Sequence, residues 1–203
     1  MKRNALIIFA REPKLGKVKT RLAKDVGDRE ALRLYKSFVR HTLKMVKEVK
    51  DMDCYIFYAG SNASMPFLRK YARQFTLKKQ QGSDLGERMY RAFKYVEGCG
   101  YENALIIGTD CLEINAKDID RAIKMLGKND YVLGPSMDGG YYLLGSKRTQ
   151  RSIFQGIAWG ESEVLSKTVQ KMEKMGKSYR FLPRKRDIDH LSDWLNYLKK
   201  NRL

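Results

Sequence analysis

A short apolar run that ends in a glycine and a carboxylate stands near the middle of the chain. Residues 104–107, Ala-Leu-Ile-Ile, precede Gly108, Thr109 and Asp110. Four apolar residues between polar positions are typical of a strand that is buried on both faces. Ligands of open α/β sheets bind at the carboxyl ends of the strands, where Asp110 would lie. A carboxylate there suits a divalent cation such as Mg2+ or Mn2+ that carries a phosphorylated substrate, although Asp is also a favoured helix N-cap.

A basic loop follows the first apolar run of the chain, residues 5–10. Pro13 and Gly16 interrupt regular structure in this loop, and Thr20 can start the next helical turn. The cationic side chains of the loop are Arg11, Lys14, Lys17, Lys19 and Arg21. A cationic loop between a strand and a helix can bind phosphate through side-chain charges and free N–H groups. The spacing is not that of a P-loop, and a solvated basic loop is the alternative.

Two further polar segments can contribute to the same site. Residues 81–89 form a glycine-broken stretch that runs into a predicted helix, which Ser83 or Asp84 could cap. In the second half of the chain, Asp138 precedes two adjacent glycines, residues 139–140. Such glycines let the backbone approach a ligand closely, and a plain turn is the alternative reading.

Two carboxylates lie close together near the C-terminus. Asp187 and Asp189 flank one apolar residue, so on an extended segment they face the same side. Either could assist Asp110 in holding a cation. His190 follows them, but one histidine without a second gives little support for a transition-metal site.

The elements that must position these residues alternate between strand and helix. Strands are predicted at residues 5–10, 54–59, 75–79, 104–107, 131–133, 141–144 and 178–182. Helices are predicted at 28–50, 65–73, 85–96, 116–126, 161–175 and 191–200. Asp28 is the predicted cap of the first of these helices, and His41 within it is a surface or packing residue. The order predicts a three-layer α/β/α domain, residues 1–203, around a mostly parallel sheet with an antiparallel or irregular element in its second half.

The composition narrows the classes of partner. The chain has 41 basic and 23 acidic residues and a net charge of +18, which favours a nucleotide, a nucleic acid or an anionic membrane surface. A surface that is basic only for solubility is the alternative. No apolar run approaches the roughly 20 residues of a membrane span. Three scattered cysteines without a CxxC motif suit a reducing compartment, so we expect a cytoplasmic protein.

Six stretches, taken in order, resemble a known family. They are FAREPKLGKVKTRL (9–22), QGSDLGERM (81–89), LIIGTDC (105–111), LGPSMDGGYYLLG (133–145), Trp159 and DIDHLSDW (187–194). Together they resemble the small bacterial and archaeal glycosyltransferase-like proteins of the nucleotide-diphospho-sugar transferase superfamily, some of which are linked to arsenosugar biosynthesis. The wider superfamily includes molybdenum cofactor guanylyltransferases and 2-phospho-L-lactate guanylyltransferases.

The resemblance implies a Rossmann-like type A glycosyltransferase fold and a role for each motif. The residues that it places around the nucleotide phosphates are Arg11, Lys17, Lys19 and Arg21. Those that it places near the nucleoside are Gln81, Asp84 and Arg88. The implied metal ligands are Asp110 and Asp189. The residues implied on the acceptor side are Asp138, Gly139, Gly140 and Trp159. Two positions depart from the family pattern, since Leu112 replaces a usual proline and His190-Leu191 replaces a usual Thr-Pro.

We therefore expect a metal-dependent transferase that uses a nucleotide or nucleotide-sugar donor, a small-molecule acceptor and Mg2+ or Mn2+. The predicted catalytic residues are Asp110, Lys19 and Asp138. Two reactions stay open: transfer of a nucleotidyl group to an acceptor phosphate with release of pyrophosphate, and transfer of a sugar to an acceptor hydroxyl, with Asp138 as a base. An RNA-binding protein or an inactive interaction protein is the alternative class. RNA binding is disfavoured because the basic residues are dispersed and no aromatic stacking motif is present. The oligomeric state, including a homo-oligomer, stays open.

Overall fold

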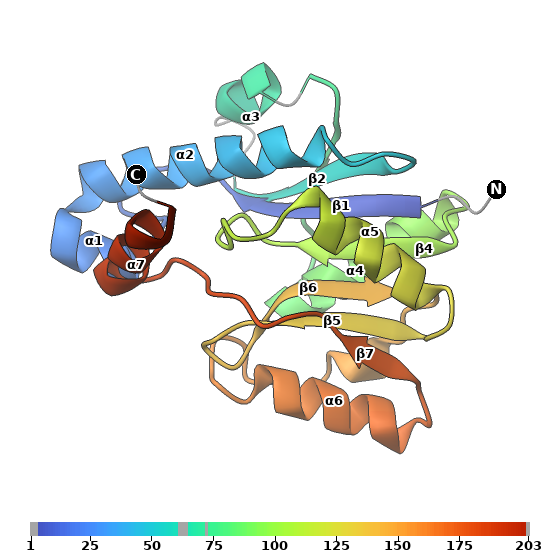
Figure 1. The fold of residues 1–203 in the computed structure, drawn as a ribbon. Coiled ribbons are helices and arrows are strands. Elements are labelled where there is room, and N and C mark those ends of the chain that lie inside the picture. Colours follow the sequence, from blue (N-terminus) through green and yellow to red (C-terminus); the bar gives the residue numbers. More distant parts are fainter. Residues whose placement is uncertain (1–3, 61–64, 72, 202–203) are drawn as a thin grey trace.

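The computed structural model describes residues 4–60, 65–71 and 73–201, and its helices and strands alternate along most of the chain (Figure 1). The strands are β1 (Asn4–Arg11), β2 (Asp53–Ala59), β3 (Thr76–Lys79), β4 (Asn103–Ile107), β5 (Tyr131–Pro135), β6 (Tyr141–Ser146) and β7 (Tyr179–Phe181). The helices are α1 (Thr20–Val26), α2 (Asp28–Val46), α3 (Met65–Tyr71), α4 (Leu85–Gly98), α5 (Ala116–Leu126), the 3-10 helix η2 (Arg151–Ile153), α6 (Val164–Lys174) and α7 (Leu191–Asn201).

The strands form one mixed sheet in the order β3-β2-β1-β4-β6-β5-β7. Strand β1 lies between β2 and β4 and is parallel to both. Strand β6 is antiparallel to β4 and β5, and β7 is again parallel to β5. The predicted mostly parallel sheet with an antiparallel element in its second half is therefore confirmed, and β6 is that element.

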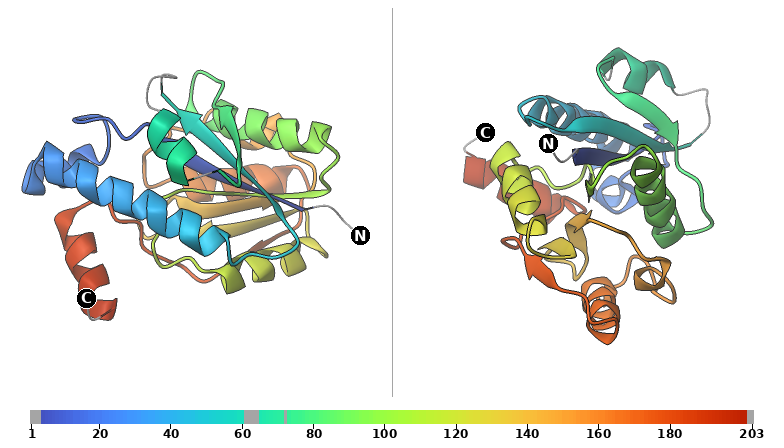
Figure 2. Two further views of the ribbon diagram at one scale, coloured as in Figure 1. Left: turned by 90° about the horizontal axis from the view of Figure 1, so that it is seen from above. Right: turned by 90° about the vertical axis from the view of Figure 1, so that its right-hand side faces the viewer.

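Helices cover both faces of this sheet. Apolar residues of α2, α3 and α5 pack in one core cluster, and residues of α4, α6 and η2 pack in another. Viewed along the strands in the right-hand panel of Figure 2, α4 and α5 lie on opposite sides of the sheet. Strand β4 contributes to both clusters, since Leu105 and Ile107 face the first while Ala104 and Ile106 face the second. Burial of all five residues of β4 explains why its apolar residues are consecutive and do not alternate with polar ones.

The ends of several elements differ from the sequence prediction. Helix α2 ends at Val46, and its N-cap is Gly27, so Asp28 is the first residue of the helix and not its cap. Helix α6 begins at Val164, three residues after the predicted start. Helix α3 ends at Tyr71, and residue 72 of its predicted range lies outside the described residues. The predicted cap of α4 is confirmed, because the Asp84 carboxylate accepts a hydrogen bond from the Glu87 N–H at 2.8 Å.

A third apolar cluster lies beside the carboxyl ends of β1 and β4. Leu22 of α1 and Phe38 of α2 pack there with Ile188, and Trp194 of α7 packs against them. The segment between β7 and α7 crosses this edge of the sheet, as Figure 1 shows in orange and red. The Ile188 N–H donates to the Asp110 carbonyl at 3.0 Å. The cluster thus fixes the segment that carries Asp187 and Asp189 against the end of β4.

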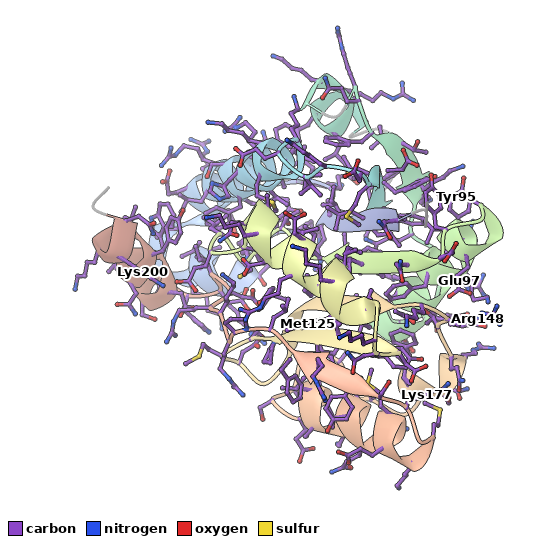
Figure 3. All side chains as sticks on the ribbon, turned by 45° about the vertical axis from the view of Figure 1, so that its right-hand side comes forward. Tyr95, Glu97, Met125, Arg148, Lys177 and Lys200 are labelled. Carbon is purple, nitrogen blue, oxygen red and sulfur yellow. The ribbon has the colours of Figure 1, made fainter. Side chains whose placement is uncertain are left out.

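Helix α2 carries a row of basic residues at helical spacing: Arg29, Arg33, Lys36, Arg40 and Lys44. Other basic side chains lie elsewhere, with Lys200 at one side of the view in Figure 3 and Arg148 and Lys177 at the other. Among the helices that the structure describes, none combines the length and the apolar character that a bilayer crossing needs.

Candidate functional site

Lys19 joins two carboxylates that are far apart in the sequence. Its Nζ atom lies 2.9 Å from Asp110 Oδ2 and 2.9 Å from Asp189 Oδ1, and only 4% of its side chain is exposed. Burial alone would lower the pKa of the ammonium, but the charges and hydrogen bonds of the two carboxylates raise the pKa above its usual value. Lys19 is therefore charged at neutral pH and ties together the β1–α1 loop, the end of β4 and the segment before α7.

The backbone of Lys19 adopts an unusual conformation. Its φ of 48° and ψ of 45° lie in the left-handed region, where a residue with a Cβ is strained by about 1–2 kcal/mol. Lys19 directly precedes α1, whose first helical residue is Thr20, so the start of this helix determines where the lysine side chain leaves the backbone. Strain at such a position persists only when the surrounding contacts favour it, and here these contacts are the two ion pairs.

A cavity of about 650 Å³ surrounds this ion-pair triad. Its carboxylates belong to Asp84, Asp110, Asp138, Asp187 and Asp189. Its cations are Arg11, Lys19, Arg21 and Arg88. The remaining polar side chains include those of Gln80 and Ser83, from the loop before α4. The cavity thus combines an acidic floor near Lys19 with arginines from three separate segments.

Two of the carboxylates differ in their electrostatic environment. Burial would raise the pKa of Asp189, but Lys19 and then Arg21 lower the pKa below its usual value. Burial raises the pKa of Asp187 to about 7, and the negative charges of Asp110 and Asp138 add to this rise. No ion pair or hydrogen bond links the Asp187 carboxylate to another of the residues that the structure describes. The acidic cluster therefore carries more negative charge than Lys19 neutralises.

Tyr35 fixes the end of β1 at this cavity. Its hydroxyl accepts a hydrogen bond from the Arg11 N–H at 2.7 Å and donates to the Arg11 carbonyl at 3.0 Å. Burial, together with the nearby charge of Asp110, raises the pKa of Tyr35 to about 12, so the hydroxyl keeps its proton at neutral pH. Gln80 links the same strand end to β2, because its Nε2 donates to the Ala10 carbonyl at 3.4 Å and to the Phe57 carbonyl of β2 at 2.9 Å.

The loop between β5 and β6 places Asp138 at the cavity. The Asp138 carboxylate accepts hydrogen bonds from the Gly140 N–H at 3.0 Å and from the Ser136 hydroxyl. Gly139 has a φ of +88°, and a Cβ there would lie 1.9 Å from the Ser162 carbonyl oxygen. The glycine at position 139 is therefore required by packing against the segment before α6. This packing explains the glycine at position 139 without the close approach of a ligand to the backbone that the sequence suggested.

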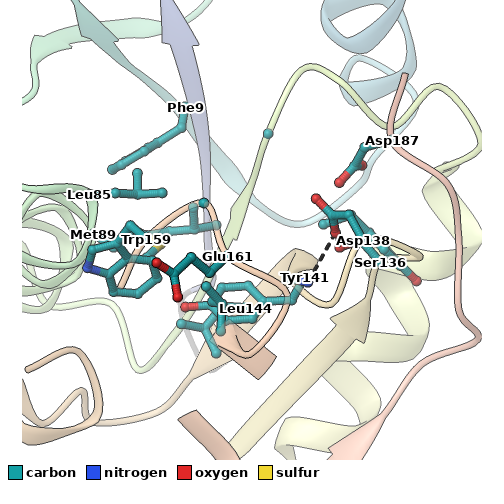
Figure 4. A pocket seen from close by; sticks show the side chains of 16 residues that line it. Phe9, Leu85, Met89, Ser136, Asp138, Tyr141, Leu144, Trp159, Glu161 and Asp187 are labelled. Carbon is teal, nitrogen blue, oxygen red and sulfur yellow. Dashed lines mark hydrogen bonds between the residues drawn. The ribbon is translucent and has the colours of Figure 1, made fainter. Parts of the chain in front are cut away.

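A smaller pocket of about 230 Å³ adjoins the larger cavity. The two share several lining residues, among them Phe9, Asp138, Tyr141 and Asp187. Trp159 forms one wall of the smaller pocket and packs on the start of α4, where a Cβ at Gly86 would lie 2.4 Å from the indole ring. Figure 4 shows this pocket and its lining side chains.

The structure brings most of the predicted site residues together. Those that line the larger cavity are Arg11, Lys19, Arg21, Asp84, Arg88, Asp110, Asp138, Asp187 and Asp189. Those that line the smaller pocket include Gly140 and Trp159. Three predicted residues line neither space: Lys17, whose side chain is exposed, Gln81 and Gly139.

Some residues that line the site were not predicted from the sequence. Gln80, rather than its neighbour Gln81, reaches the cavity, and its position directly after β3 was the available signal. Tyr35 and Glu161 had no motif to mark them. The alternative that Asp110 caps the next helix is wrong, because α5 begins at Ala116 and Asn115 is its cap.

The segment after Asp110 is held by contacts although it lacks the usual proline. Leu112 is buried in the third apolar cluster, and its carbonyl lies 3.2 Å from Nε2 of His41. His41 is thus a packing residue with a hydrogen bond to the loop, in line with its predicted role.

The carboxylates of the larger cavity are candidate ligands for a divalent cation. Within the described part of the chain, no three Asp, Glu, His or Cys side chains surround a single ion position. Protein-bound Mg2+ commonly takes only one or two carboxylates and completes its shell with substrate phosphates and water. Asp110 and Asp189 fit this pattern.

Comparison with known proteins places this architecture among nucleotide-diphospho-sugar transferase folds. The chain belongs to a family described as "Uncharacterized protein conserved in bacteria (DUF2064)", whose model matches residues 42–161. A structure from Desulfovibrio desulfuricans G20, described provisionally as a nucleotide-diphospho-sugar transferase, is similar with 33% sequence identity and a TM-score of 0.93. The match covers 100% of this chain and 89% of that one.

More distant structures share the fold alone. CMP:2-keto-3-deoxy-manno-octonic acid synthetase matches at 10% identity with a TM-score of 0.64, covering 100% of both chains. The 4-diphosphocytidyl-2C-methyl-D-erythritol synthase of Anaerococcus prevotii DSM 20548 matches at 13% identity with a TM-score of 0.65, covering 100% of this chain and 97% of that one. No curated protein matches the sequence. The predicted Rossmann-like, three-layer fold is confirmed.

Proposed function

We propose that this protein is a divalent-metal-dependent transferase that takes a sugar from a nucleotide-sugar donor and passes it to a small-molecule acceptor. The observation that carries this proposal is the convergence of Lys19, Asp110 and Asp189 in a cavity whose walls hold three arginines. The 33% identical relative described as a nucleotide-diphospho-sugar transferase supports a sugar donor.

The cations of the cavity suit the diphosphate of such a donor. Arg11, Arg21 and Arg88 approach the cavity from the end of β1, the start of α1 and the first turns of α4. A hydrogen bond to a charged group contributes about 1.5–3 kcal/mol. Three such bonds would sum to roughly 5–9 kcal/mol before ordering costs, and micromolar affinity requires about 8 kcal/mol. The arginines could therefore supply most of the donor's affinity, while the choice of base must come from other groups.

Asp110 and Asp189 are the residues that would hold Mg2+ or Mn2+. When bound, the ion would supply positive charge against the donor's phosphates and the leaving diphosphate. Lys19 carries one positive charge against these two carboxylates, so the pair retains negative charge for a cation. Asp187 beside them has a pKa raised to about 7, and a bound cation would favour loss of its proton.

The reaction that we propose balances as a displacement at the sugar. The acceptor hydroxyl oxygen bonds to the anomeric carbon, the bond from that carbon to the diphosphate oxygen breaks, and the nucleoside diphosphate leaves. Asp138, whose carboxylate is fixed by the Gly140 N–H and the Ser136 hydroxyl, takes the proton of the acceptor hydroxyl. The rival reaction is nucleotidyl transfer from a nucleoside triphosphate with release of pyrophosphate, and the four cations of the cavity would also suit a triphosphate.

A thermal-shift plate of nucleotide sugars and nucleoside triphosphates, each with and without Mn2+, tests the proposal. A ligand that binds only the folded protein raises the melting temperature, so nucleotide sugars should stabilise it in the presence of Mn2+. Asp110→Asn should remove the Mn2+-dependent part of that shift. Asp120→Asn, on the exposed face of α5, is the matched control and should retain it. Stabilisation by triphosphates alone would favour the rival reaction, and an unchanged shift in Asp110→Asn would reject the assigned metal ligand.

A further inference from the structure

The smaller pocket is acidic, although the protein as a whole is strongly basic. Its ionisable lining residues are Asp138, Glu161 and Asp187, and no lysine, arginine or histidine appears among the described residues that line it. The chain carries a net charge of +18. A pocket with three acidic side chains and no cation therefore departs from the general surface, and the carboxylates of Asp138 and Glu161 disfavour an anionic ligand by like-charge repulsion.

The two ends of this pocket differ in chemistry. In Figure 4, Phe9, Leu85, Met89 and Trp159 gather at one end, with the Glu161 carboxylate beside Trp159, and Asp138 and Asp187 lie at the other end. The apolar end offers two aromatic faces and two flexible aliphatic side chains. A volume of about 230 Å³ exceeds the roughly 150 Å³ of an apolar cavity that is known to bind benzene. The pocket thus has room for a substituted or two-ring aromatic group.

The ring of Tyr141 forms part of the pocket wall. Its hydroxyl is buried and has no hydrogen-bond partner in the structure, although its side chain lines the pocket. In Figure 4 the side chain extends beneath the pocket from the Asp138 side towards the Trp159 side. The hydroxyl lies beside Thr168 of α6, away from the pocket interior, and the pocket meets the ring of Tyr141 instead.

We propose that this pocket binds the acceptor of the transfer reaction, and that the acceptor is an uncharged or cationic aromatic alcohol. Its ring would pack between Phe9, Leu85 and Trp159, and its hydroxyl would point to Asp138. This inference rests on the proposed function, because it assigns the acceptor for the same site. It also selects between the two reactions. A phosphate or carboxylate acceptor would enter a pocket with three acidic side chains, whereas an alcohol meets a base and no opposing charge.

The test compares three probes that share one ring system and differ in charge. Isothermal titration calorimetry is carried out at neutral pH with 2-naphthylmethanol, 2-naphthylmethylamine and 2-naphthoate. We expect the alcohol and the amine to bind at least tenfold more tightly than the carboxylate. Equal or tighter binding of 2-naphthoate overturns the proposal, and so does a lack of binding by all three probes.

Charge reversal at the pocket rim gives an internal check. Glu161 is exposed, so Glu161→Lys should fold, and it should tighten 2-naphthoate at least threefold while weakening the amine. Glu163→Lys is the matched control, because Glu163 is an exposed residue on the same segment that does not line the pocket. Equal effects of the two variants would reject the pocket as the binding site.

Failure of this inference can be separated from failure of the proposed function. Donor binding is measured on the same protein preparation by thermal shift with nucleotide sugars and Mn2+. Donor binding without binding of the ring probes rejects only the acceptor assignment. Absence of binding by every donor rejects the proposed function itself.

Discussion

Replacement of Lys19 by methionine tests the central ion-pair triad. Methionine is unbranched like lysine and also has a Cβ, so the strain of the left-handed backbone at position 19 is the same in both. The substitution therefore removes mainly the ammonium group. The lysine makes two contacts of 2.9 Å to carboxylates, and two hydrogen bonds to charged groups contribute about 3–6 kcal/mol together. The side chains of Asp110 and Asp189 are 42% and 32% exposed, so water would partly solvate them in the variant. With this discount we expect a loss of about 2–3 kcal/mol in the free energy of unfolding.

Urea denaturation, followed by circular dichroism at pH 7 with a chelator present, measures this loss. For a chain of this length it corresponds to a fall of roughly 5–10 °C in melting temperature. Lys24→Met is the matched control, since Lys24 is exposed on the same short helix, and it should change the stability by less than about 0.5 kcal/mol. A Lys19→Met protein as stable as the wild type would refute the claim that the triad holds these segments together.

The same variant has a characteristic pH dependence. In the wild type, Lys19 lowers the pKa of Asp189, so the contribution of the ion pair is complete near neutrality and is lost as the pH falls through that lowered pKa. Lys19→Met has no such contribution to lose, because its carboxylates face each other without a cation. The stability difference between variant and wild type should therefore shrink between pH 7 and pH 3. A difference that stays constant over this range would point to lost packing, and not to lost charge.

Three further expectations concern the loops and the buried groups of the site. Tyr141→Phe removes a buried hydroxyl without a partner and should raise the free energy of unfolding by about 1 kcal/mol, and a loss of stability on urea denaturation would contradict this. Gly139→Ala should lower the free energy of unfolding by roughly 3 kcal/mol, because the new Cβ would strike the Ser162 carbonyl. Gly156→Ala is the control, since Gly156 has a φ of +64° and no atom near its Cβ, and it should lower the free energy of unfolding by about 1 kcal/mol. Urea denaturation of the two variants side by side measures that contrast. The raised pKa of Asp187, about 7, means that the folded protein keeps a proton that the unfolded chain loses near pH 4. Wild-type stability should therefore fall between pH 5 and pH 8 in the presence of a chelator, and Asp187→Asn should reduce that fall; equal slopes would contradict the assignment.

The local part of the fold could be read from the sequence. The consecutive apolar residues of β4 predicted a strand buried on both faces, and both core clusters confirm it. Asp84 was recognisable as a cap because an Asp directly before an amphipathic helix can accept a hydrogen bond from a free N–H of the first turn. Gly27 was not recognised as the cap of α2, because Asp28 beside it satisfied the same rule.

The interactions between distant segments could not be read in the same way. Lys19 was predicted to contact phosphate, and the loop position alone supported that, yet its partners in the structure are Asp110 and Asp189, the latter 170 residues away. Nothing in the local pattern indicates which carboxylate a lysine will reach. The packing role of Gly139 could not be read for the same reason, since the atom that excludes a side chain there belongs to Ser162 in another loop.

The segment that crosses the sheet edge between β7 and α7 has a consequence for proteolysis. It carries Asp187 and Asp189 and makes a backbone hydrogen bond to Asp110, while every strand of the sheet precedes it in the chain. A protease that cut just after Leu182 would leave the whole sheet in place and detach two of the acidic groups around Lys19. Loss of the residues after Leu182 would therefore remove two carboxylates of the candidate site while most of the chain stayed intact.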